Sequence, residues 1–168
     1  DTKLRATNII RRRGGNGANT LEVLSQLLPA DNFDTETSTY STDLSLLAVL
    51  PHQTSPDTQA VITSLPDVSP RLFQYRPDQQ VAASSYIIQS TANLTRTIVS
   101  SNPLEEMTVA EFIAAIEPLL RLRQDNVWIH FEGRNPAVLL GCVTWVREVY
   151  GYRGRVNVSV ECEKPDRV

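Results

Sequence analysis

The chain has 168 residues, of which 41% are hydrophobic and 21% are charged, and its formal net charge is −3. This length predicts one domain with a substantial core. The charge balance excludes nucleic acid and anionic membrane surfaces as electrostatically favoured partners, and no apolar run approaches the roughly 20 residues of a membrane-spanning helix.

Residues 4–13 are predicted to form a strand of mixed polarity, which runs into the glycine-rich sequence GGNGAN at 14–19 and then into a short leucine-rich helix. Asn16 and Asn19 lie three residues apart, on one face of the helix entrance. Carboxamides suit a ligand with several hydroxyls, because each amide both donates and accepts hydrogen bonds. A plain capped turn is an equally good interpretation. The loop lacks the lysine of a GxxxxGK[ST] phosphate loop and does not fit GxGxxG.

A buried strand is predicted at 44–50 and a short helix at 58–65. A series of short strands is predicted to follow them. These strands, at 71–75, 81–90 and 94–100, are separated by turn residues, which predicts antiparallel pairing. Their mixture of apolar and polar residues predicts a sheet that is apolar on one side and open on the other. Such a sheet is either a lid over a site or a contact between two copies.

Helical periodicity returns at 108–120, behind a capping box formed by Thr108 and Glu111. Pro118 is expected to kink or end this helix. The apolar run at 127–131 is predicted to be a strand buried on both faces.

A second helix is predicted to follow this strand, with Asn135 as its cap and Pro136 at its first position. Alternating valines at 156–160 predict the next strand. Because a helix joins the two strands, we expect them to be parallel, with a right-handed crossover.

Polar side chains follow both strands of this unit. Glu132, Arg134 and Asn135 leave the first strand, and Glu161 and Glu163 leave the second. Ligands of open α/β sheets bind at this edge. These residues either form a site there or are solvated turn residues, and charge alone favours the second interpretation.

The cysteines and histidines show no metal-ligand spacing. Cys142 and Cys162 are expected to be reduced, buried thiols, which favours a cytoplasmic location. His52 and His130 are far apart in sequence. His130 falls in the apolar run at 127–131, where a hydrogen-bonded core histidine is expected rather than a ligand or a base.

Four stretches together carry a resemblance to a known family: RGGNGAN at 13–19, the strands at 81–88 and 95–99, WIHFEGRN at 128–135, and VSVECEKP at 158–165. In this order they resemble the PfkB-type (ribokinase-like) carbohydrate kinases, and the last two are similar to the ketohexokinases in particular.

The resemblance implies an α/β fold of the ribokinase-like, three-layer type, with a largely parallel but incomplete central sheet and a small antiparallel β lid. The lid strands would lie at about 3–13 and 71–100, and the α/β core at 14–70 and 104–168.

The resemblance also implies phosphoryl transfer from ATP, with magnesium, to a hydroxyl of a sugar, a ketose such as fructose being favoured. Glu161 and Glu163 are hypothesised to support the magnesium ion indirectly. The positions that match substrate-binding residues of the family are Gly15, Asn16, Asn19, Arg96, Glu132, Arg134 and Asn135.

The chain also departs from the family pattern. The opening strand with a sugar-binding aspartate and the Gly-Ala-Gly-Asp turn that supplies the catalytic base have no counterpart here, and the family's adenine-binding stretch lies further towards the C-terminus. We therefore expect an N-terminal-to-middle portion of a sugar kinase, which contains no catalytic residue of its own and cannot phosphorylate sugar alone. Two alternatives stay open: a non-catalytic binding or regulatory module that dimerises through the lid strands, and an unrelated α/β protein.

Overall fold

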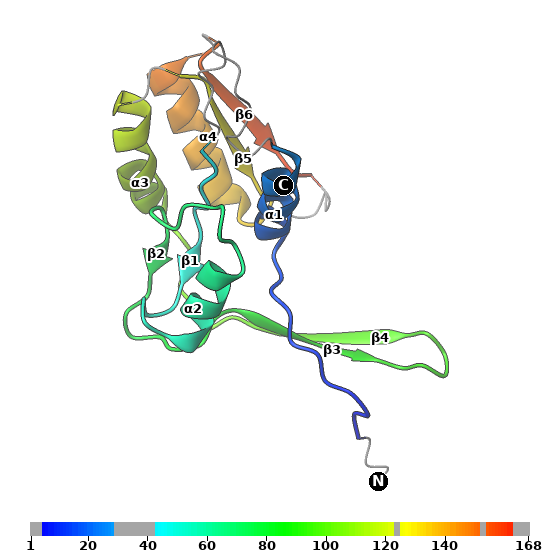
Figure 1. Cartoon of the computed structure of the whole chain (residues 1–168). Helices are drawn as coiled ribbons and strands as arrows, with labels where there is room; N and C mark the ends of the chain where they lie inside the picture. The colour runs from blue at the N-terminus through cyan, green and yellow to red at the C-terminus, as the bar shows by residue number, and fades with distance from the viewer. Residues whose placement is uncertain (1–4, 29–42, 123–124, 152–153, 163–168) are drawn as a thin grey trace, which may run out of the picture.

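The structure, a computed structural model, describes residues 5–28, 43–122, 125–151 and 154–162. Within these residues the protein is mixed α/β, with four helices, two small parallel sheets and one antiparallel sheet (Figure 1). The elements in chain order are α1 (Asn16–Leu27), β1 (Val49–Leu50), α2 (Pro56–Thr63), β2 (Gln74–Tyr75), β3 (Ser84–Gln89), β4 (Arg96–Ser101), α3 (Val109–Leu122), β5 (Val127–Phe131), α4 (Pro136–Tyr150) and β6 (Val156–Val160).

The predicted strand–helix–strand unit is confirmed as β5, α4 and β6. The two strands are parallel over five residue pairs. Asn135 caps α4, because its side chain accepts a hydrogen bond from the Val138 backbone N–H, and Pro136 begins the helix. Gly151 ends the helix with a φ of 65°, a conformation that glycine adopts without steric cost.

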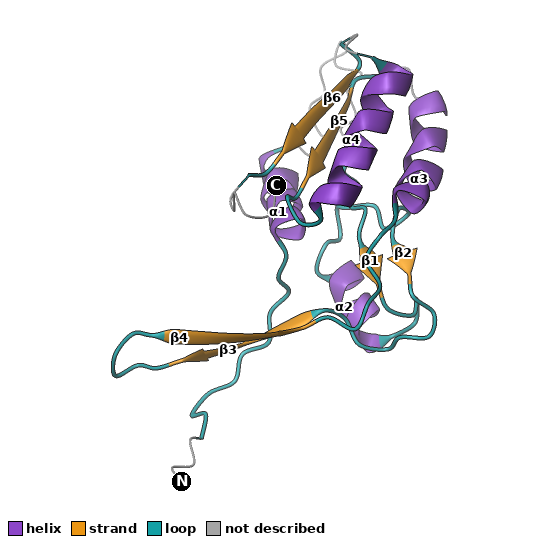
Figure 2. Cartoon of the chain, turned by 180° about the vertical axis from the view of Figure 1, so that it is seen from behind, coloured by secondary structure: helices purple, strands orange, loops and turns teal. Residues whose placement is uncertain are grey.

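The main hydrophobic core lies between α3, α4 and the β5–β6 sheet, and Figure 2 shows both helices running alongside that sheet. Its buried members are Leu72, Phe112, Ile116, Leu120, Cys142 and Val146.

The prediction that β5 is buried on both faces is wrong. Burial alternates along this strand, with Ile129 facing the core while Trp128, which is 75% exposed, and His130 lie on the opposite face. The helices cover one face of the sheet, so the aromatic residues on the other face remain in contact with solvent. His130 is therefore not a core histidine.

Helix α3 continues through Pro118 to Leu122, so the expectation that this proline ends the helix or divides it into two pieces is wrong. Proline removes the bond that its N–H would donate to the carbonyl of Ala114. Both residues are exposed, so water can satisfy that carbonyl, while the buried side chains of Phe112, Ile116 and Leu120 keep the helix in register against the core.

The antiparallel pairing of the middle strands is correct for β3 and β4 only, because β2 instead pairs in parallel with β1. The β3–β4 hairpin projects from the body as an arm (Figures 1 and 2). Every residue of both strands is exposed. Tyr86 and Ile87 are neighbours and thus point to opposite faces, so the hairpin is apolar on both faces and not on one.

The strand predicted at 4–13 is not formed in its described part, since residues 5–13 have no regular secondary structure. A strand needs a partner, and this exposed segment pairs with none of the described strands. The helix that follows is anchored by a second cluster in which Ala18 packs with Leu65 and Val68. Among the described helices, none has the length and apolarity that crossing a membrane requires.

Candidate functional site

The carboxyl ends of β5 and β6 bring two glutamates next to each other. Phe131 pairs with Val160, so Glu132 and Glu161 occupy the next pair of positions, and the Glu161 N–H donates to the Phe131 carbonyl at 2.9 Å. Burial and, second, the negative charge of Glu161 raise the pKa of Glu132, while the charges of Arg134 and His130 oppose this rise. We call Glu132 and Glu161 the acidic rim.

The N-terminus of α1 lies against the acidic rim. The Asn16 side-chain Nδ2 donates to both carboxylate oxygens of Glu161, at 3.0 and 3.3 Å. Gly17 comes so close to Glu132 that an added Cβ would lie 2.9 Å from its Oε1. Gly15, at the helix N-cap, has a φ of 96°, which requires glycine. The glycine-rich sequence thus permits a close approach that joins residues 145 positions apart.

Asn19 lies one turn further along α1 and has a different partner. Its Oδ1 accepts a hydrogen bond of 2.9 Å from Arg13 Nη1, and the other Nη atom of Arg13 pairs with Glu22. The two asparagines therefore do not share a hydrogen-bonding partner. Asn16 binds to the acidic rim, whereas Asn19 is held by Arg13.

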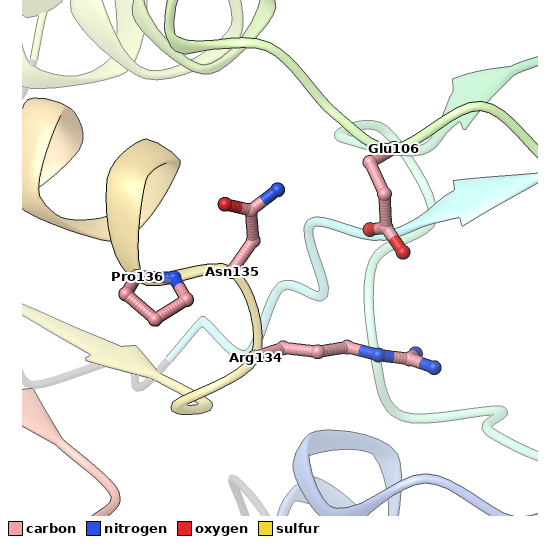
Figure 3. Close-up of a pocket in the computed structure, with 4 residues that line it drawn as sticks. All are labelled: Glu106, Arg134, Asn135 and Pro136. Carbon is pink, nitrogen blue, oxygen red and sulfur yellow. The ribbon is translucent and has the colours of Figure 1, made fainter. Parts of the chain in front are cut away.

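Beyond the rim, the turn between β5 and α4 borders an open hollow of about 380 Å³, lined by Glu106, Arg134, Asn135 and Pro136 (Figure 3). Arg134 and Asn135 were predicted from sequence. Glu106 was not, because two adjacent glutamates in a loop are an ordinary surface pattern. Glu106 lines the hollow only because of the way in which the loop between β4 and α3 packs.

Arg76 fixes that loop. Its guanidinium donates to the carbonyls of Glu105 and Glu106, at 3.1 and 3.2 Å, and pairs with the Glu111 carboxylate at 2.8 Å. The pKa of Glu111 is held below its ordinary value, mainly by the hydrogen bonds from Arg76. The second cause is the hydrogen bond from the Thr108 N–H, which is part of the predicted capping box. Glu106 is thereby held at the hollow by its backbone.

The open face of the β5–β6 sheet carries a small polar network. Trp128 Nε1 donates to Ser159 Oγ at 2.8 Å, and the same oxygen lies 2.8 Å from His130 Nδ1. Ser159 Oγ thus contacts both side chains, and the tautomer of His130 decides which atom donates in the second contact. Through Ser159 the two rings are held on the open face of the sheet.

The remaining predicted residues lie elsewhere. Arg96 pairs with Gln89 at the turn end of the hairpin, and that arm projects away from the β5–β6 edge (Figure 1), so the structure does not bring Arg96 to the rim. Glu163 lies outside the described residues. Cys142 is buried as expected, and burial raises the pKa of its thiol to about 11. Cys162 is exposed, contrary to expectation, because it follows β6 at the solvent edge of the sheet.

We expect Glu132→Gln to raise the free energy of unfolding at neutral pH by a few tenths to about 1 kcal/mol, the size of a like-charge cross-strand pair. The raised pKa of Glu132 means that its contribution to stability is present below its ordinary pKa of 4.5 and is lost as the pH rises through the folded-state pKa. The higher free energy of unfolding of Glu132→Gln relative to wild type should therefore vanish below pH 4.5. Urea unfolding across this pH range measures it.

Glu148→Gln is the matched control, because Glu148 is exposed on α4 away from the rim. It should show no comparable pH-dependent gain. Destabilisation by Glu132→Gln at neutral pH would mean that the charged carboxylate makes a favourable interaction that outweighs its burial.

A magnesium ion, and the nucleotide that it would accompany, are expected from the resemblance alone. Magnesium is commonly held by one or two carboxylates with water and phosphate oxygens. Glu132 and Glu161 offer two carboxylates, but Glu161 already binds Asn16, and no group of three His, Cys, Asp or Glu side chains in the described part of the chain could hold a metal ion. No chemical step is therefore assigned to either group.

Comparisons with protein-family models, with curated proteins and with solved structures find no match to this chain. The functional conclusion therefore depends on the chemistry of the residues themselves.

Proposed function

We propose that this protein is a carbohydrate-kinase-like protein whose α1–β5–β6 corner binds a sugar. In this proposal the mixed α/β core is part of a ribokinase-like, three-layer fold. The observation that carries it is the contact of Asn16 with the acidic rim, where an amide and two carboxylates converge. These groups together donate and accept, as recognition of a polyhydroxylated ligand requires.

The reaction proposed for the complete kinase is ATP-dependent phosphorylation of a ketose hydroxyl, for example of fructose. Such catalysis is mostly positioning and charge neutralisation. The described residues supply positioning, through Asn16 and the rim, but no catalytic base, nucleotide site or magnesium site is assigned to them. We therefore propose that this chain binds sugar and does not transfer phosphate by itself.

The test combines binding and turnover. Calorimetric titration with fructose should show binding, and Asn16→Ala should weaken it about three- to tenfold, the value of one hydrogen bond. Thr20→Ala, exposed on the same helix, should not. The chain with ATP, magnesium and fructose should form no sugar-dependent ADP. Absence of fructose binding would refute the sugar site. Sustained ADP formation would refute the proposal that this chain does not transfer phosphate by itself.

A second candidate function is that of a non-catalytic module that dimerises through the hairpin. The observation that favours it is the exposed apolar surface on both hairpin faces, which includes Tyr86, Ile87, Ile88, Ile98 and Val99. Exposed apolar patches of this kind mark interaction surfaces. Sedimentation equilibrium should then show a dimer that Ile87→Lys converts to a monomer, and a monomeric wild-type chain would exclude this candidate.

A further inference from the structure

The hollow beside the rim has walls of opposite charge. Glu106 contributes a carboxylate from the loop between β4 and α3, and Arg134 contributes a guanidinium from the turn between β5 and α4 (Figure 3). Within the described residues Arg134 forms no ion pair, with Glu106 or with any other carboxylate. Both charges are exposed, so each is available to a ligand that enters between them.

The donor side of the hollow includes a second group. The Oδ1 atom of Asn135 accepts the cap hydrogen bond from the Val138 N–H, at 3.3 Å. Its Nδ2 atom, which Figure 3 shows on the side towards Glu106, is therefore a donor to the hollow. Arg134 and Asn135 can together bind an anionic group or another strong acceptor.

The acceptor side is held in place. Arg76 binds the carbonyls of Glu105 and Glu106 and is itself fixed by Glu111. The Glu106 carboxylate has one long contact, 3.4 Å from Asn102 Nδ2, and so keeps acceptor capacity for hydroxyl donors. Because the loop is already ordered, ligand binding does not have to fix it.

We infer that Glu106 is a ligand-binding residue, and that the hollow between Glu106 and Arg134 takes a polyhydroxylated ligand that carries an anionic group, such as a sugar phosphate. Hydroxyls donate to Glu106, and the anionic group pairs with Arg134. This inference rests on the proposed function, because it takes a sugar as the ligand, and it extends the proposed site from the rim to the neighbouring hollow. The volume, about 380 Å³, lies within the usual range of small-molecule sites.

The experiment titrates the full 168-residue chain with fructose 1-phosphate, fructose and inorganic phosphate. Wild type should bind fructose 1-phosphate more tightly than the other two. Glu106→Gln should weaken fructose 1-phosphate and fructose about tenfold, as loss of a charged acceptor does, and should not weaken inorganic phosphate. Arg134→Gln should weaken fructose 1-phosphate and inorganic phosphate about tenfold and leave fructose nearly unchanged.

Glu105→Gln is the matched control. It makes the same change of charge one residue away, on a side chain that does not line the hollow, and should leave all three affinities unchanged. Equal effects of Glu105→Gln and Glu106→Gln would overturn the inference, as would equal affinity of wild type for fructose and fructose 1-phosphate.

The two proposals can fail separately. If Asn16→Ala leaves fructose binding unchanged while Glu106→Gln weakens it, the rim is not the sugar site and the hollow is. If Asn16→Ala weakens fructose binding and Glu106→Gln has no effect, the proposed function stands and the inference is overturned. If wild type binds none of the three compounds, both are refuted.

Discussion

Replacing Phe112 by alanine is expected to lower the free energy of unfolding by about 3–5 kcal/mol, the range measured for large aromatic truncations in cores. Phe112 is 1% exposed and lies at the centre of the main core. Its ring packs against Phe131 from β5, with ring centroids 5.4 Å apart, and against Trp145 from α4, at 6.1 Å and nearly perpendicular. One side chain thus joins α3, α4 and the sheet, so its removal leaves a cavity that three elements border. Urea denaturation measures the loss.

The control for this prediction is Tyr86→Ala, which truncates an aromatic residue that is 67% exposed on the hairpin. Its effect should stay within about 0.5 kcal/mol, as for other surface positions. A loss below about 1 kcal/mol for Phe112→Ala would mean that the α3–α4–sheet interface does not form the stable core of this protein.

Replacing Arg76 by alanine is expected to cost about 2–3 kcal/mol. The side chain is 15% exposed and the Glu111 side chain 32% exposed, so the pair is only partly screened by solvent. The substitution removes the ion pair together with the bonds to the Glu105 and Glu106 carbonyls. Breaking such a pair is costly because the remaining carboxylate and carbonyls lose their partners.

The pH dependence of the Arg76→Ala effect follows from Glu111. Its pKa is lowered in the folded state, so its stabilising contribution is present above the ordinary value of 4.5 and is lost as the pH falls through the folded-state pKa. The difference between wild type and Arg76→Ala should therefore narrow below pH 4.5. Urea unfolding at neutral and acidic pH measures this.

Arg121→Ala provides the matched control. Arg121 pairs with Glu117 one helical turn away, and these side chains are 71% and 34% exposed. Exposed pairs of this kind contribute little, so we expect a loss of less than about 0.5 kcal/mol. If Arg76→Ala cost no more than Arg121→Ala, the loop that carries Glu106 would not depend on Arg76.

Local signals in the sequence determined much of the architecture. The Asn135–Pro136 helix start, the capping box of Thr108 and Glu111, and the parallel β5–β6 pair are all present in the structure. Each depends on residues a few positions apart, or on a helix long enough to return the chain beside its first strand. The position of the acidic rim at the strand ends follows from the same unit.

The tertiary structure alone decided which distant residues meet and which faces stay open. The Asn16–Glu161 contact spans 145 positions, and Glu106 reaches the hollow because Arg76, 30 positions earlier, binds its carbonyl. Neither separation leaves a periodic pattern to read. Pairing and burial are also non-local, which is why residues 5–13 form no strand and Trp128 remains exposed. A strand exists only where a partner supplies hydrogen bonds, and a face is buried only where another element covers it.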